Sequence, residues 1–117
     1  MTYEEYRRGI MFFEAKDYAE AGRILAPLAE QEPGNQALLE TLGRAYFHSA
    51  QLSRAEAAFR DLVELAPDHG WAHEALARTL ERRNRPDEAR RHRNLARAMG
   101  APVTGESELS VTAANLA

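Results

Sequence analysis

Residues 42–67, LGRAYFHSAQLSRAEAAFRDLVELAP, decide the fold of this 117-residue chain. Apolar and small side chains recur in it at helical spacing, first from Leu42 to Tyr46 and again from Ala55 through Phe59. The polar break at residues 48–51 separates the two runs, and Pro67 ends the second. The stretch therefore predicts two helices joined by a short turn.

The same pattern occurs three times when the chain is shifted by 34 residues. Small and bulky residues then fall into register in the sets Gly9, Gly43, Ala77; Phe12, Tyr46, Leu80; Ala21, Ala55, Ala89; and Pro33, Pro67. We therefore divide the chain into three consecutive units, residues 2–35, 36–69 and 70–103.

Each unit predicts two helices, which gives six in all. Their expected ranges are about 3–15, 18–31, 36–49, 53–65, 70–83 and 86–99. Capping-box pairs are expected at Thr2 with Glu5, Asp17 with Glu20, and Ser53 with Glu56. Asn35 and Asp68 are expected to be further N-caps, and Pro86 suits a first helical position.

The small residues have a packing reason. Gly9, Gly43 and Ala77 lie on first helices, where a missing or short side chain lets a second helix approach closely. One helix pair cannot bury its apolar face alone, so neighbouring pairs must stack. We predict an all-α fold, a right-handed superhelical stack of three antiparallel helix pairs whose concave face is lined by the first helices.

At this point the sequence resembles the tetratricopeptide repeat family. The resemblance rests on the 34-residue period and, in the second unit, on Leu42–Gly43, Tyr46, Ala55, Phe59 and Pro67. It implies a single repeat domain over residues 1–100 that binds peptides or protein surfaces, with no cofactor and no catalysis of its own.

The chain departs from the family pattern in several places. Glu5, Leu39 and His73 stand where the family often has Trp, and Pro27 lies inside a predicted helix, which it should bend. In the third unit Arg93 and Ala96 replace larger apolar residues, which predicts that the array stops there. The tail, residues 101–117, is expected to be disordered or to form a weak capping helix.

Composition narrows the class further. The formal net charge is −3, and the absence of cysteine excludes disulfides and thiolate chemistry. No apolar run approaches the roughly 20 residues of a membrane helix. A cytoplasmic protein with no membrane association is expected, and the bias towards Ala and Arg fits a small bacterial protein.

The concave face supplies the candidate binding residues, because aromatic residues and Arg are enriched at interface hot spots. They are Tyr3, Tyr6, Ile10, Phe13, Glu40, Arg44, Phe47, His48, Trp71, Arg78 and Arg82. Trp71 is expected to be partly exposed, with Arg44 and Arg78 beside it to meet an acidic or C-terminal group. Two alternatives stay open: some aromatics complete the interhelix core, or they mediate self-association into a homo-oligomer.

Other functions find less support in the sequence. The family's clamp for chaperone C-termini would fall on Tyr6, Ile10, Thr41, Trp71 and Ala75, and none of these residues matches it. An Arg-rich third unit offers the alternative of a nucleic-acid-binding accessory protein, although the acidic net charge argues against nucleic acid as a partner. His69 and His73 are too few for a metal site, and no catalytic set has the required spacing. We therefore predict a protein or peptide partner for a chain that is not an enzyme.

Overall fold

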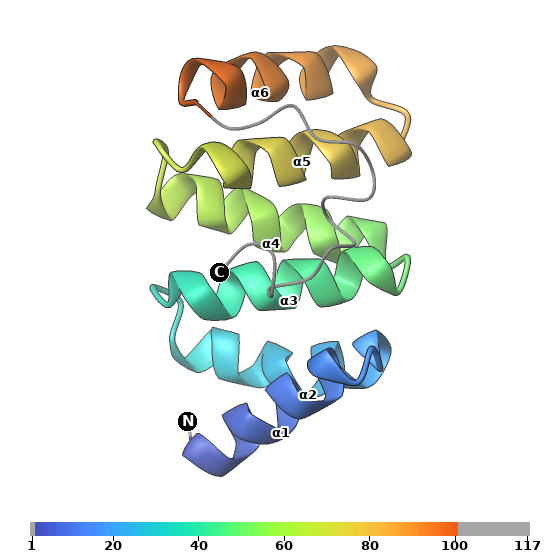
Figure 1. The fold of residues 1–117 in the computed structure, drawn as a ribbon, viewed down its shortest axis with the longest axis vertical. Helices are drawn as coiled ribbons and strands as arrows, with labels where there is room; N and C mark the ends of the chain where they lie inside the picture. The colour runs from blue at the N-terminus through green and yellow to red at the C-terminus, as the bar shows by residue number, and fades with distance from the viewer. Residues whose placement is uncertain (1, 101–117) are drawn as a thin grey trace.

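The computed structural model describes residues 2–100, which form six helices and no strand. The helices are α1 (Tyr3–Glu14), α2 (Tyr18–Gln31), α3 (Gln36–His48), α4 (Leu52–Leu65), α5 (Gly70–Arg82) and α6 (Pro86–Ala98). Figure 1 shows them stacked in chain order, from α1 at one end to α6 at the other. The predicted all-α stack of three helix pairs is confirmed, and the predicted helix bounds lie within two residues of those observed.

Three of the predicted N-caps form. The side chains of Thr2, Asp17 and Asn35 accept hydrogen bonds from backbone amides three residues later, at 3.2, 3.4 and 3.1 Å. Each bond satisfies an amide that the first helical turn leaves without a partner.

Two predicted caps are wrong. Ser53 lies inside α4, which begins at Leu52 after Gln51 at the N-cap, so Ser53 has helical geometry and does not cap. Asp68 lies one residue too early, because His69 holds the N-cap of α5. Neither N-cap side chain, that of Gln51 or that of His69, accepts a capping hydrogen bond from a backbone amide of its helix.

Each helix pair turns on a residue with left-handed backbone geometry. Lys16, Ala50 and Asn84 have φ angles of 65°, 61° and 62° and are spaced by one repeat length. The amide that follows each of them bonds back to the first helix, as Gln51 N does to Tyr46 O at 2.8 Å. These turns satisfy carbonyl groups at the helix ends and bring the paired helices together.

The close approach expected at the small residues is present. A Cβ on Gly43 would lie 2.7 Å from Cδ1 of Phe59, and one on Gly9 would lie 2.6 Å from Cγ of Leu25. Leu25 and Phe59 are fully buried. The absent side chains are therefore what admits a large residue from the paired helix.

Extensive packing joins only helices adjacent in sequence, both within and between pairs. The buried side chains form three neighbouring clusters along the stack rather than one central core. α2 stays helical through Pro27, whose ring is exposed. In this arrangement each helix pair depends on its neighbours for burial.

The predictions for the tail, residues 101–117, lie outside the described residues. Within residues 2–100, no helix is both long enough and apolar enough to span a membrane. The division into one repeat domain and a tail stays a prediction.

Candidate functional site

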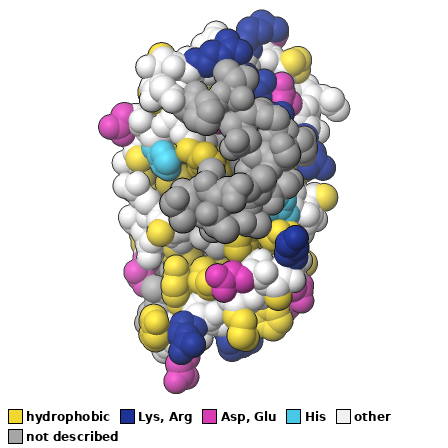
Figure 2. Space-filling model, viewed as in Figure 1, with side chains coloured by type: hydrophobic (Ala, Val, Ile, Leu, Met, Phe, Trp, Pro, Cys, Tyr) yellow, Lys and Arg dark blue, Asp and Glu magenta, His cyan; other side chains and the backbone are white. Residues whose placement is uncertain are grey.

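The face formed by the first helices begins at α1 with apolar side chains. Tyr3 is 73% exposed, and Tyr6 and Ile10 are half-buried. All three line a hollow of about 640 Å³, together with Met11, which is also exposed. In the view of Figure 2, hydrophobic side chains group towards the α1 end of the stack with some Lys and Arg side chains beside them, and further Lys and Arg side chains lie at the α6 end.

Arg44 and Trp71 form the centre of this face and join α3 to α5. The Arg44 guanidinium carbon lies 4.7 Å from the centroid of the Trp71 ring, a cation–π arrangement. Its Nη2 donates to Glu40 Oε1 at 2.7 Å. Trp71 is half-buried and meets Phe59 edge-on at 5.9 Å. The ring is therefore partly accessible, as expected, and is held from both sides.

Arg44 differs from its expected role. Its side chain is only 3% exposed, and burial lowers the pKa of its guanidinium while the charge of Glu40 opposes that effect. Its Nε is buried and makes no hydrogen bond within the described residues. Arg44 therefore positions Trp71 rather than extending towards solvent.

Phe13 and Phe47 are not exposed on the face, which corrects the expectation from the sequence. They are 5% and 2% exposed. Phe13 packs edge-on against Tyr18 at 5.5 Å, so it joins α1 to α2. For these two residues the alternative left open above is correct: they complete the interhelix core.

His48 and Arg82 lie at the end of the helices near the turns. The His48 ring packs against Tyr18 at 4.7 Å and links α3 to α2. The Arg82 guanidinium carbon lies 5.0 Å from the centroid of the Phe47 ring, while the residue itself stays exposed. Both side chains cover the end of the buried cluster.

Arg78 is paired within α5. Its side chain is 15% exposed, with Nε 3.5 Å from Glu74 and Nη1 3.9 Å from Glu81. The same two carboxylates bind Arg93 of α6, at 3.3 and 2.7 Å. Arg93, expected to mark a polar edge of the array, is thus an ion-pair partner that joins α5 and α6.

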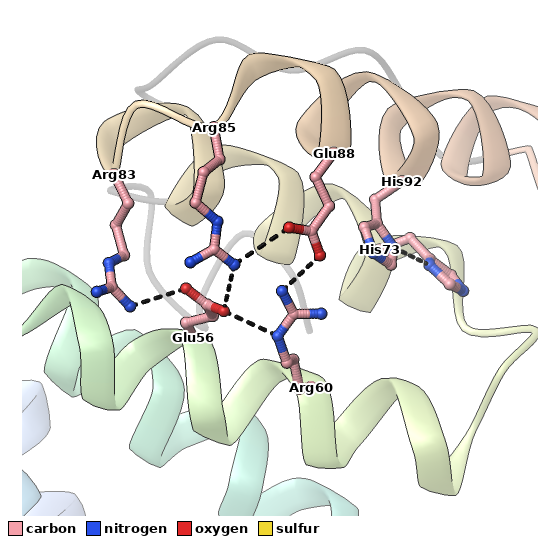
Figure 3. A network of polar contacts seen from close by, with 7 residues as sticks. All are labelled: Glu56, Arg60, His73, Arg83, Arg85, Glu88 and His92. Carbon is pink, nitrogen blue, oxygen red and sulfur yellow. Dashed lines mark hydrogen bonds and ion pairs between the residues drawn. The ribbon is translucent and has the colours of Figure 1, made fainter.

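A second polar network, which the sequence did not predict, joins α4 to the turn before α6 (Figure 3). Glu56 accepts hydrogen bonds from Arg60, Arg83 and Arg85 at 2.7–2.8 Å. Glu88 binds Arg60 and Arg85 as well. Burial raises the pKa of Glu56, but the hydrogen bonds from Arg60 and Arg85 outweigh it, so the net pKa lies below its usual value.

Two histidines stack beside this network. His73 Nδ1 lies 3.1 Å from His92 Nδ1, and the ring centroids are 5.3 Å apart. His73 Nε2 lies 2.8 Å from the carbonyl oxygen of Pro67, which can only accept, so Nε2 must carry the proton. When the His73 ring is neutral, its Nδ1 accepts from His92 Nδ1. Among residues 2–100 no group of three or more metal-ligating side chains exists.

These pairings bear on the Arg-rich third unit. Arg78, Arg83, Arg85, Arg90 and Arg93 are each within ion-pair distance of a carboxylate. Internal carboxylates therefore balance much of the positive charge of this unit, and no observation favours the nucleic-acid alternative.

Comparison with known proteins supports the repeat assignment. The model of the tetratricopeptide repeat family matches residues 12–69. No curated protein sequence matches the chain. The third unit lies outside the matched residues, but α5 and α6 repeat the arrangement of the first two pairs.

Solved structures of MamA share the fold. MamA AMB-1 is 26% identical over 82% of this chain and 57% of that one, with a TM-score of 0.77. MamA MSR-1 is 26% identical over 79% and 53%, with a TM-score of 0.74. MamA from Desulfovibrio magneticus RS-1 is 24% identical over 82% and 54%, with a TM-score of 0.75, and shows the fold alone. The chain spans just over half the length of these three proteins.

Proposed function

We propose that this chain, which carries tetratricopeptide repeats, is a scaffold that binds a segment of a protein partner along the face formed by α1, α3 and α5. The fold suggests protein–protein interaction and is typical of proteins without catalysis. The observation that carries the finer proposal is the Arg44–Trp71 pair, which joins α3 to α5 and holds a half-buried indole there.

The accessible residues define what the partner segment should offer. Tyr3, Tyr6, Ile10 and Trp71 favour apolar side chains, since each keeps some exposed surface. Arg78 favours an acidic or C-terminal group, because it keeps some exposed surface and its contacts to Glu74 and Glu81 are long, at 3.5 and 3.9 Å. We therefore propose an apolar segment with a carboxylate near one end.

The burial of Phe13, Phe47 and Arg44 refines this interface. These three buried residues pack beneath the exposed side chains of the interface. Glu40, His48 and Arg82 form its border. Self-association is a specific form of the same proposal, in which the segment comes from a second copy of this chain.

The proposal is tested by selecting peptides from a display library against the immobilised protein. Selected peptides should be rich in apolar residues with a carboxylate. Trp71→Ala should weaken their binding about tenfold or more, because aromatic hot spots contribute about 2 kcal/mol or more. Binding should also shift the emission of Trp71, the single tryptophan, to the blue.

Two further variants test whether the protein still folds and whether binding occurs on the proposed face. Tyr3→Glu alters an exposed residue of the same face and should weaken binding without changing the helical circular dichroism signal. Ala57→Glu, on exposed α4 surface, should leave binding unchanged. Peptides that bind the Trp71→Ala and Tyr3→Glu variants as tightly as they bind the parent would contradict the proposal.

A further inference from the structure

A groove runs along the second helices, apart from the interface proposed above. It has a volume of about 690 Å³ and lies between α2 and α4. Its walls include Ala26 and Ala29 of α2 and Ala57 and Ala58 of α4, whose short side chains leave the space between the helices open. Leu39, Leu42 and Tyr46 of α3 also line it.

The groove continues into a second hollow of about 410 Å³. The two share Ala26, Glu30, Tyr46 and Arg54, so they form one trough along both helices. Its lining extends from Gln51, just before α4, to Leu65, the last and exposed residue of that helix. A trough that follows two helices for most of their length suits an elongated ligand.

Hydrogen-bond acceptors surround this apolar trough. Glu30, Asp61 and Glu64 line the larger hollow, and none of them makes an ion pair within residues 2–100. The basic residue there, Arg54, is already occupied, since it donates to Gln51 at 2.7 Å and lies over the Tyr46 ring. With Arg23 of the smaller hollow counted as well, the three carboxylates still outnumber the two arginines, so the trough is net negative.

Pro27 changes the backbone hydrogen bonding of α2 where that helix lines the smaller hollow. Because proline has no backbone N–H, the carbonyl group of Arg23 lacks its usual partner one turn along α2. Arg23 and Pro27 both line the smaller hollow. Glu30 also lines the smaller hollow, so its carboxylate lies on the same helix as this carbonyl group.

We propose that this trough docks an amphipathic helix of a separate protein, with small apolar side chains on one face and Lys or Arg beside them. The alanines let the apolar face approach closely, and the basic side chains pair with Glu30, Asp61 and Glu64. A ligand rich in phosphate or carboxylate would be repelled. This second interface would let the scaffold hold two partners on different faces.

The test uses a display library of helical peptides of about 16 residues, a little over four turns. Their apolar stripe is fixed as Ala and Leu, and their polar positions are randomised among Lys, Arg, Glu and Gln. Selection against the full chain should enrich Lys and Arg. Enrichment of Glu, or the absence of any binder, overturns the proposal.

Matched charge variants locate the binding. The double variant Asp61→Lys with Glu64→Lys should weaken the selected peptides about tenfold or more. The control, Asp68→Lys with Asp87→Lys, changes the net charge equally at exposed positions outside the trough. If the two double variants lose equal amounts of peptide affinity, general electrostatic attraction explains the binding and the proposal is overturned.

Two further measurements separate this site from others. Trp71→Ala should leave these peptides bound, so failure here is distinguishable from failure of the interface on the first helices. Sedimentation analysis of the chain alone should give the same mass for the parent and for the Asp61→Lys, Glu64→Lys variant. A dimer that dissociates in that variant would make a second copy the occupant and overturn the proposal of a separate protein.

Discussion

The second and third helix pairs have the same backbone arrangement but are held together by different interactions. In the α3–α4 pair, Gly43 admits the fully buried ring of Phe59. In the α5–α6 pair, the equivalent positions are Ala77 and Arg93, and Arg93 bonds to carboxylates about one turn on either side of Ala77. The repeat thus determines where two helices touch, while the chemistry of the contact can change from apolar to ionic.

This difference predicts unequal responses to the environment. Apolar packing does not depend on protonation or salt, whereas ion pairs that are partly open to solvent depend on both. One polar network and the stacked histidines lie within the α5–α6 pair, and the other network joins that pair to α4, so sensitivity to salt and pH should concentrate there.

The largest expected effect separates the two contacts directly. Phe59→Ala should lower the free energy of unfolding by about 3–5 kcal/mol, because it removes a fully buried ring and leaves a cavity. Arg93→Ala should cost less, about 1–2 kcal/mol, since Glu81 is exposed and Glu74 keeps Arg78 nearby. Urea denaturation measures both, and equal losses would show that the two contacts contribute alike.

The next effect tests the close approach at Gly43. Gly43→Ala places a Cβ against the Phe59 ring, which should cost about 1–3 kcal/mol of strain, offset by about 1 kcal/mol of helix propensity. Gly34→Ala is the control, because nothing lies within 4 Å of its added Cβ. If thermal denaturation finds both variants as stable as the parent, the glycine is not required for packing.

A smaller effect is expected at the ionic contact between the second and third pairs. Glu56→Gln keeps the side-chain shape but removes the charge that binds Arg60, Arg83 and Arg85. These arginines are each about one-third exposed and can regain water, so the loss should be about 1–2 kcal/mol. The difference from the parent in urea denaturation should shrink at high salt.

The matched control for this variant is Glu20→Gln. Within residues 2–100 the ion-pair partner of Glu20 is the exposed Arg23 of its own helix, and solvent screens such a pair so that it contributes little to stability. If Glu56→Gln changes the free energy of unfolding no more than this control does, the network around Glu56 does not stabilise the third pair.

The smallest effect is a pH dependence at the stacked histidines. Burial, and then the neighbouring His73, lower the pKa of His92 below its ordinary value of 6.5. The unfolded chain therefore binds a proton that the folded chain excludes, and stability should fall as the pH drops from about 7 through the folded pKa. Thermal denaturation across this range should show the fall, and His92→Gln should reduce it. If the pH dependence of stability is unchanged in His92→Gln, titratable groups other than His92 cause it.

The sequence predicts the helices well because their apolar spacing is local and repeated. The bounds of α2 are reproduced to the residue, and Thr2, Asp17 and Asn35 cap as expected. Ser53 is not a cap because the left-handed turn at Ala50 lets α4 begin at Leu52. The sequence does not distinguish a serine at the N-cap from a serine at the second position of a helix.

The candidate site is harder to predict, because neighbouring aromatics face different helices. Phe12 and Phe13 are adjacent, yet only Phe13 is fully buried, since Tyr18 of α2 covers it. Glu56 is a clearer case. Its partners Arg83 and Arg85 lie 27 and 29 residues further on, a separation at which no helical or turn pattern acts. Such contacts follow only from the stacked arrangement.

The restriction of packing to adjacent helices also bears on how the chain folds. Contacts between neighbours close short loops, so the entropy lost before the first stabilising contacts form is small. Chains dominated by such contacts fold quickly, and a nucleus can begin in any pair and spread to the next. The apolar contacts of Gly9 with Leu25 and of Gly43 with Phe59 favour the first two pairs as starting points over the third pair, whose equivalent contact is ionic.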